Sequence, residues 1–250
     1  MTPRRRDFVR SWGRTFAVQG SWNYDTMIGA GIAYCLAPLL RRIHAGDPVA
    51  LQASMRRSLE SFNSHPYLSG LAIGAIAKAE LEGVEPERLD RFREALRGPL
   101  GSLGDRAVWA TWRPLCLLAA IAAHLSGLSA TWSVALFLVL YNAGHVALRT
   151  WALRTGWKRG LDLGSALRAG WLEWGPHRLA PLILLLIGVD VALLGRRVFQ
   201  MAETGLPPAL AAVGVVAAVV AFRWPLVMGR VAIGLILAVP AAWWLLGLLG

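Results

Sequence analysis

The sequence contains few charged residues. Asp, Glu, Lys and Arg make up only 16% of its 250 residues, and 56% are hydrophobic, whereas soluble domains are about a quarter charged. Four long segments hold almost no ionisable group: residues 114–148, 179–195, 206–222 and 231–249. A membrane-spanning helix needs about 20 mainly apolar residues. The composition therefore argues against an ordinary soluble domain and predicts an all-α integral membrane protein.

Reactive and metal-binding patterns are also missing. The two cysteines, Cys35 and Cys116, lie in apolar segments without a CxxC motif, so we interpret them as small buried hydrophobic residues. The five histidines show no metal-ligand spacing, and the sequence has no nucleophile motif and no phosphate-binding loop. The stretch GAGIAY, residues 29–34, lacks the third glycine of a dinucleotide site. We expect no enzymatic activity, no cofactor and no metal.

We expect no cleavable signal peptide, because the basic start is followed by polar residues rather than an apolar core. The net charge is +11, and the basic residues gather in residues 4–14 and 149–178. Basic clusters beside apolar segments are typical of cytoplasmic flanks. This placement predicts a cytoplasmic N-terminus, and no nucleic-acid motif accompanies the charge.

Residues 5–18 form a basic amphipathic pattern. Phe8, Val9, Trp12 and Phe16 recur at helical spacing, with arginines between them. Such a helix lies in the membrane interface with its arginines toward lipid phosphates. The alternative is a helix packed on the surface of the protein itself.

Two apolar segments of about 14 residues each follow a polar cluster: one follows residues 19–27, and the other follows residues 62–66 and carries Gly70 and Gly74. Segments this short do not span a bilayer. We interpret them as two re-entrant half-helix segments, of the kind that secondary transporters use to build a midplane site. The alternative is a pair of buried helices that cap a bundle. The charged residues between and after them predict cytoplasmic helices.

The rest of the chain divides at its charged stretches. Region 1–113 ends in a stretch rich in Gly and Pro, residues 98–114, which we expect to be a loop. Residues 114–148 form either a hairpin or one kinked helix, and basic residues at both ends favour the hairpin. Residues 149–178 are expected to be a basic cytoplasmic link, followed by transmembrane segments in 179–250. Counting spans places residue 203 outside and residue 227 inside.

Three long stretches form recognisable motifs: QGSWNYDTM (19–27), FNSHPYLSGLAIGAIAKAE (62–80) and GPLGSLGDRAVWATWRP (98–114). They resemble the signature segments of the IID component of mannose/fructose/sorbose-family phosphotransferase system (PTS) permeases, and a weaker match is YNAGHVALRTWALRTGWKRG (141–160). The likeness covers about residues 10–160. Arg106 departs from the family, which usually has a small or neutral residue there, and the last third is shortened.

The resemblance implies a subunit of a sugar transporter in the bacterial inner (cytoplasmic) membrane. A IIC membrane subunit and the IID subunit would together bind and translocate a hexose, and IIA and IIB phosphocarrier proteins would relay the phosphate. The pair is expected to assemble as a trimer of IIC–IID pairs. The alternative is a membrane scaffold or sensor that keeps the fold without transport.

Sugar hydroxyls are recognised by amide and carboxylate groups, and aromatic faces lie against the C–H side of the ring. The first stretch supplies such groups at Gln19, Trp22, Asn23 and Asp25, and the second at Asn63, Ser64 and His65. The alternative role for Asn23, Asn63 and Ser64 is helix capping.

The third stretch contributes Asp105, Trp109 and Thr111 as structural or path-lining residues. Asp105 is expected either to pair with Arg106 or Arg113, which would hold the loop, or to face the permeation path.

Overall fold

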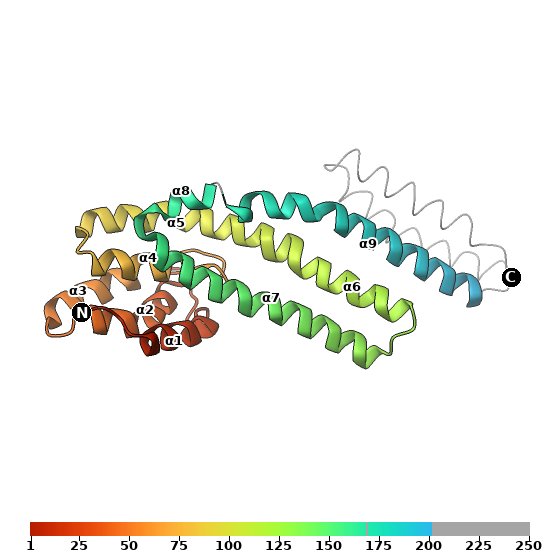
Figure 1. The fold of residues 1–250 in the computed structure, drawn as a ribbon, viewed down its shortest axis with the longest axis horizontal. Helices are drawn as coiled ribbons and strands as arrows, with labels where there is room; N and C mark the ends of the chain where they lie inside the picture. Colours follow the sequence, from red (N-terminus) through yellow and green to blue (C-terminus); the bar gives the residue numbers. More distant parts are fainter. Residues whose placement is uncertain (169, 202–250) are drawn as a thin grey trace.

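The computed structural model describes residues 1–168 and 170–201, and within these ranges every regular element is helical (Figure 1). The expectation of an all-α protein is confirmed. Residues 203 and 227, on which the predicted topology of the last segments depends, lie outside the described residues.

The helices form two groups. Four short helices make a compact bundle at the N-terminal end of the chain: α1 (Arg5–Arg14), α2 (Gly29–Ile43), α3 (Pro48–Leu59) and α4 (Ser69–Leu81). Three long helical stretches extend away from this bundle (Figure 1). They comprise α5 (Pro86–Gly104) with the π-helix η2 (Asp105–Trp112) and α6 (Arg113–Leu125), then α7 (Ala130–Arg159), and α9 (Trp171–Met201).

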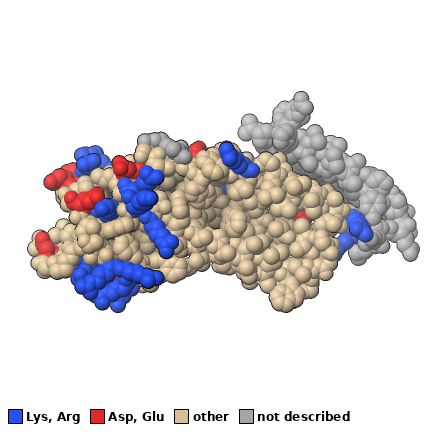
Figure 2. Space-filling view, viewed as in Figure 1, with Lys and Arg blue, Asp and Glu red and all other residues tan. Residues whose placement is uncertain are grey.

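The long helices are the membrane-spanning candidates. Pro86–Leu125, Ala130–Leu167 and Trp171–Arg197 are each long and apolar enough to cross a bilayer. Figure 2 shows the charged side chains gathered over the short helices and near the far end of α9, with a mostly uncharged surface between them. An uncharged band between charged ends is the pattern of a protein that crosses a membrane.

Helix α4 packs against the long helix α7 and crosses it at very short range. Side chains on all its faces are buried, as expected for a helix that is apolar all round. A Cβ added at Gly74 would lie 2.5 Å from both the Leu153 oxygen and the Trp157 nitrogen of α7. A Cβ at Gly156 of α7 would likewise overlap the α4 backbone. Small residues at a helix interface allow two helix backbones to touch. These glycines therefore make the close crossing of α4 and α7 possible.

These contacts bear on the expected half-helices. Helix α2 packs against α1, α3 and α4, and α4 packs against α2, α5 and α7, so protein rather than lipid covers their apolar surfaces. The packing favours the alternative interpretation, a pair of buried helices in a bundle. The depth of α2 and α4 in the membrane stays a prediction.

A buried carboxylate ties three of the short helices together. The Glu80 side chain, at the end of α4, accepts a hydrogen bond from Arg57 Nη2 at 3.2 Å and one from the Ser54 hydroxyl. His44 Nε2, just after α2, lies 3.0 Å from the same carboxylate. Burial strengthens such a network because water does not compete for its partners. The sequence patterns identified Glu80 only as the end of a motif.

The prediction of a loop at residues 98–114 is wrong. Helix α5 continues through Gly98 and Pro99 into η2 and then α6 without a break. Leu100 and Leu103 on this stretch are buried, and tertiary packing of this kind outweighs weak helix propensity. The Thr111 hydroxyl donates to the Arg106 carbonyl, five residues earlier, at 2.8 Å.

The hairpin at 114–148 is present. Helices α6 and α7 are joined by a turn in which Gly127 has a φ of +115°, and the Ser129 hydroxyl accepts a hydrogen bond from the Trp132 nitrogen. Helix α7 then continues past residue 148 to Arg159. The segment 149–178, expected as a link, is therefore largely helical and includes η3 (Gly160–Asp162), α8 (Leu163–Arg168) and the start of α9.

Replacement of Gly74 by Ala should destabilise the bundle by about 1–3 kcal/mol, because the added methyl group overpacks a backbone contact. Thermal unfolding of the full chain in detergent, followed by circular dichroism, measures this effect. The matched control is Gly98→Ala in α5, where an added Cβ has no neighbour within 4 Å, and it should cause no loss. Equal behaviour of the two variants would contradict the proposed crossing.

Candidate functional site

Three stretches that are distant in sequence meet where the short bundle joins the long helices. The Ile28 nitrogen donates to the Phe62 oxygen, and the Phe62 nitrogen to the Thr26 oxygen, both at 3.1 Å. These bonds hold the loop at 19–28 against the segment at 61–66. The His65 nitrogen donates to the Leu100 oxygen of α5 at 3.3 Å, and the side chain of His65 lies so close to Gly104 that a Cβ there would overlap it.

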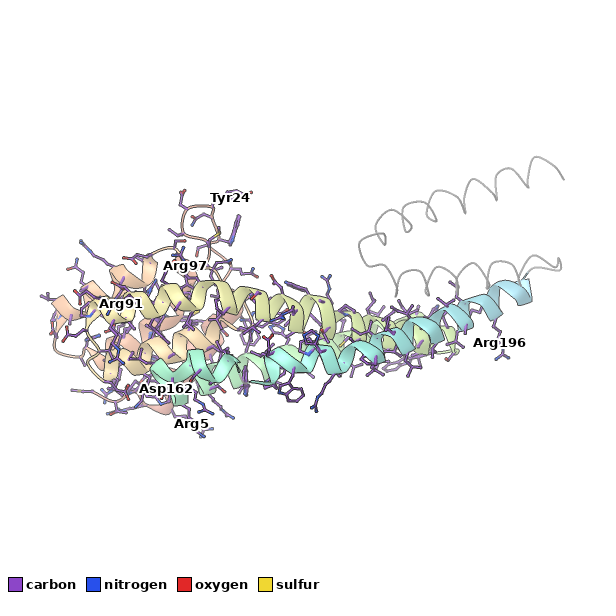
Figure 3. All side chains as sticks on the ribbon, turned by 90° about the horizontal axis from the view of Figure 1, so that it is seen from above. Arg5, Tyr24, Arg91, Arg97, Asp162 and Arg196 are labelled. Atoms are coloured by element: carbon purple, nitrogen blue, oxygen red, sulfur yellow. The ribbon has the colours of Figure 1, made fainter. Side chains whose placement is uncertain are left out.

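The loop at 19–28 projects from the molecule, as the position of Tyr24 in Figure 3 shows. The side chains of Gln19, Trp22, Asn23 and Asp25 are all exposed on it. The Trp22 and Tyr24 rings contact edge to face, with centroids 4.8 Å apart. An exposed aromatic pair on a projecting loop is typical of a contact surface.

The amide of Asn23 is occupied within its own loop. Its Oδ1 accepts hydrogen bonds from the Asp25 and Thr26 nitrogens at 3.0 and 2.8 Å, and its Nδ2 donates to the Thr26 hydroxyl at 2.8 Å. This is the local turn that Asn favours. Because α2 begins only at Gly29, the capping that we considered for Asn23 takes place in the loop rather than at the helix.

Asn63 differs from Asn23 in this respect. Its side chain is exposed and makes no hydrogen bond with any of the residues described, and its Nδ2 would lie 3.8 Å from a Cβ at Gly101. The amide therefore stands beside α5 with both donor and acceptor available. Gln19 is likewise exposed, without a side-chain hydrogen bond in the described part of the chain.

Ser64 and His65 are buried, with 5% and 2% of their surface exposed. The Ser64 hydroxyl donates to the His65 oxygen, and His65 Nδ1 accepts from the Tyr67 nitrogen at 3.2 Å. Burial, together with the nearby charges of Arg149 and His145, lowers the pKa of His65 to about 4. His65 is thus a neutral ring at pH 7, packed edge to face with Trp109.

The residues of the third stretch likewise divide into exposed and buried side chains. Asp105 is exposed and forms no salt bridge within residues 1–168 and 170–201, so neither expected pairing is present. Arg106 instead pairs with Glu173 at the start of α9, at 2.9 Å. This partner explains how a charged residue is accommodated at position 106. Thr111 is buried, whereas Trp109 is 38% exposed.

The sequence patterns missed the residue that connects these parts. Arg149 on α7 is buried, and its Nη1 donates to the Pro66 oxygen at 3.1 Å and to the Thr15 oxygen. Its Nε donates to His145 Nε2 at 2.6 Å, and its guanidinium lies 4.8 Å from the centre of the Tyr67 ring. Within the described residues, the partners of this guanidinium are carbonyl oxygens and ring faces rather than a carboxylate.

The surroundings of Arg149 are themselves ordered. The Tyr67 ring stacks on His145, with centroids 4.1 Å apart, and its hydroxyl lies 2.7 Å from the hydroxyl of Tyr141. The weak fourth match at residues 141–160 contains His145 and Arg149 four positions apart. This spacing places two side chains on one helix face, and it was the only signal for the cluster in the sequence.

The helices and the uncharged band define the class, a helical membrane protein. A family model described as "PTS system mannose/fructose/sorbose family IID component" matches residues 4–174. The chain belongs to this family, and the resemblance of the three stretches is confirmed.

Curated relatives agree with this assignment. The chain is 28% identical over 165 residues to the mannose-specific EIID component of Escherichia coli K12, which covers 64% of this chain and 58% of the relative. It is also 28% identical to the sorbose-specific EIID component of Klebsiella pneumoniae (74% and 68% covered) and to the fructose permease IID component of Bacillus subtilis (64% and 58% covered). The chain thus matches less than two thirds of the length of the E. coli and B. subtilis relatives.

Solved structures share the fold. One, titled as the mannose transporter ManYZ in complex with microcin E492, aligns with a TM-score of 0.58 at 22% identity over 96% of each chain. Another, titled only as a membrane protein, gives a TM-score of 0.67 at 26% identity over 76% of this chain and 71% of that chain.

The lowered pKa of His65 predicts a pH dependence of stability. An unfolded histidine takes up a proton below about pH 6.5, whereas folded His65 does so only near pH 4. Between these values the unfolded state binds more protons, so stability should fall as the pH falls. Thermal unfolding at pH 7.5 and 5.0 should show a smaller acid-induced loss in His65→Asn than in the wild type. The control, His177→Asn at an exposed position, should keep the full loss.

Replacement of Arg149 by Lys should destabilise the chain, because one ammonium group cannot reach both the two carbonyls and His145. Each buried acceptor left without a partner costs about 1–3 kcal/mol. Denaturation of the detergent-solubilised chain measures the effect, with Arg159→Lys at the exposed end of α7 as a neutral control. Unchanged stability of Arg149→Lys would show that the cluster does not hold the site together.

Proposed function

We propose that this chain is the IID membrane subunit of a phosphoenolpyruvate-dependent sugar PTS permease, and that with a IIC subunit it forms the path along which a hexose is bound and translocated. Membership of the IID family supports the class of transporter. The observation that carries the proposal is the meeting of the three family stretches at one place, with amide, carboxylate and aromatic side chains exposed around it.

Asn63 is the residue that best fits contact with a sugar. Its amide offers two donors and an acceptor to neighbouring hydroxyls, and no described residue uses them. Trp109 lies on η2, and His65 packs edge to face against it, with ring centroids 5.2 Å apart. The exposed part of Trp109 would lie against the apolar face of the sugar ring.

The other candidates take supporting roles in this proposal. Gln19, Trp22 and Asp25 supply further hydrogen-bonding and aromatic groups on the projecting loop, and Asn23 shapes that loop. Ser64, His65 and Thr111 are buried and fix the backbone beneath the site. Asp105 is exposed and has no described partner, which fits the path-lining role better than the structural one.

The partners follow from the same proposal. A IIC subunit would cover the projecting loop, because the exposed Trp22 and Tyr24 rings are suited to a protein interface. The pair would assemble as a trimer of IIC–IID pairs in the bacterial inner membrane, among membrane lipids and with the N-terminus in the cytoplasm. IIA and IIB proteins would carry out the phosphoryl transfer, and this chain would need no cofactor. The curated relatives described above are all named as EIID or IID components, which disfavours the scaffold or sensor.

Asn63→Ala should lower sugar uptake about five-fold or more, which is the loss expected for one hydrogen bond in a binding site. The chain would be reconstituted in liposomes with its IIC subunit and phosphorylated IIB, and uptake of labelled mannose, fructose, sorbose and glucose would be followed. Asn142→Ala on α7 is the matched control, because among the described residues that exposed amide bonds only to the Leu138 oxygen of its own helix.

Assembly must be measured beside uptake. Copurification with IIC should be unchanged in Asn63→Ala, whereas Asn23→Ala should weaken both assembly and uptake through the loop. Full uptake by Asn63→Ala would exclude Asn63 from the sugar site. Failure of the intact complex with every hexose would contradict transport and favour the scaffold.

A further inference from the structure

A groove between α1 and α7 lies on the other side of the molecule from the candidate sugar site. Figure 3 places Arg5, on α1, at the edge opposite Tyr24. The groove has a volume of about 610 Å³, within the range of about 300–1,000 Å³ that is typical of ligand pockets. Its apolar lining comes from Phe8, Val9, Trp12, Leu153 and Trp157.

The apolar face of α1 explains how this groove forms. Phe8 packs edge to face on Trp157 with ring centroids 4.8 Å apart, and Trp12 Nε1 donates to the Thr150 hydroxyl at 3.1 Å. These contacts hold the inner side of α1 on α7, so the helix packs on the protein itself. Val9 remains 56% exposed beside them, and an apolar strip between the two helices stays open.

The rim of the groove is cationic. Arg5 and Arg154 line it, and the described lining residues include no Asp or Glu. Both arginines are exposed, and within residues 1–168 and 170–201 neither forms a salt bridge or a side-chain hydrogen bond. Figure 2 shows a cluster of basic side chains over α1. The groove thus pairs an apolar trough with two guanidinium groups that have no anionic partner among the described residues.

The groove also lies at the height where lipid headgroups are expected. Helix α7 is free of charge from residue 130 to 148 and carries Arg149, Arg154, Lys158 and Arg159 in its last turns. A spanning helix changes from apolar to basic at the level of the lipid phosphates, where tryptophan is also enriched. Trp12 and Trp157 line the groove at this level.

We propose that this groove binds an anionic phospholipid of the surrounding bilayer, with an acyl chain along the apolar strip between α1 and α7 and the phosphate between Arg5 and Arg154. A guanidinium group binds phosphate through paired N–H donors, and its apolar stem covers the chain beside it. This site is independent of the sugar site and of the proposed transport function.

The test is lipid retention by the full chain. Native mass spectrometry of the purified chain, titrated with phosphatidylglycerol or phosphatidylcholine, counts the bound lipids. We expect one phosphatidylglycerol held more tightly than phosphatidylcholine. The double variant R5Q/R154Q should weaken its binding by about 30-fold, or roughly five-fold for each arginine.

The matched control is R10Q/R159Q, which removes the same charge from the same two helices at exposed positions outside the groove. It should bind phosphatidylglycerol as the wild type does. Equal losses in both double variants would mean diffuse attraction to a basic surface, and no loss in R5Q/R154Q would mean binding elsewhere. Either result, or equal retention of phosphatidylcholine, overturns the proposal.

A photoreactive phosphatidylglycerol, carrying its diazirine on the acyl chain, locates the lipid. Crosslinks should map to peptides of α1 and to residues 150–157, both in the isolated chain and in the complex with its IIC subunit. Labelling spread evenly over the long helices would contradict the site. Loss of the crosslink in the complex would show that a partner chain fills the groove, and this result would overturn the proposal too.

Discussion

The backbone contact between α4 and α7 is the constraint on which the rest of the structure depends. Gly74 and Gly156 allow the two helices to meet without side chains between them, and this places the start of α4 directly beside α7. The segment that carries Asn63 and His65 comes just before α4, and His145 and Arg149 lie on the facing part of α7. A wider crossing would separate these groups, because interior packing transmits small shifts rather than absorbing them.

Beside that crossing, the side chain of Arg149 connects the two parts of the molecule, the bundle of short helices and the long helices. A buried guanidinium is costly unless its donors are satisfied, and here the carbonyls of Thr15 and Pro66, together with His145, satisfy them. A carboxylate would bind the cation more strongly but would fix only one neighbour. Two carbonyls from different segments hold the short 3-10 helix η1 (Thr15–Ala17) and the start of the second family stretch to one point of α7.

Much of the fold could be predicted from the sequence. The apolar segments and the helices after both polar clusters follow from composition and length, and the basic residues at both ends favoured the hairpin at 114–148 over a kinked helix. The Gly/Pro-rich stretch at 98–114 could not be predicted, because local propensity favours a loop and only the burial of Leu100 and Leu103 makes it helical. The role of Gly74 was also hidden, since its partner Gly156 lies 82 positions later and no local pattern connects them.

The sequence predicted which residues could form the candidate site but not how they are arranged. Residue type alone made Asn23 and Asn63 equivalent, because both are amides in polar clusters before apolar helices. In the structure the Asn23 amide bonds to its own loop, whereas the Asn63 amide has no described partner. The difference comes from the backbone: the turn at 23–26 folds back on the Asn23 side chain, and the pairing of Phe62 with Thr26 holds the following residue outward. In this site, the side chain suited to bind a ligand is therefore the one whose hydrogen-bonding groups no neighbouring residue uses.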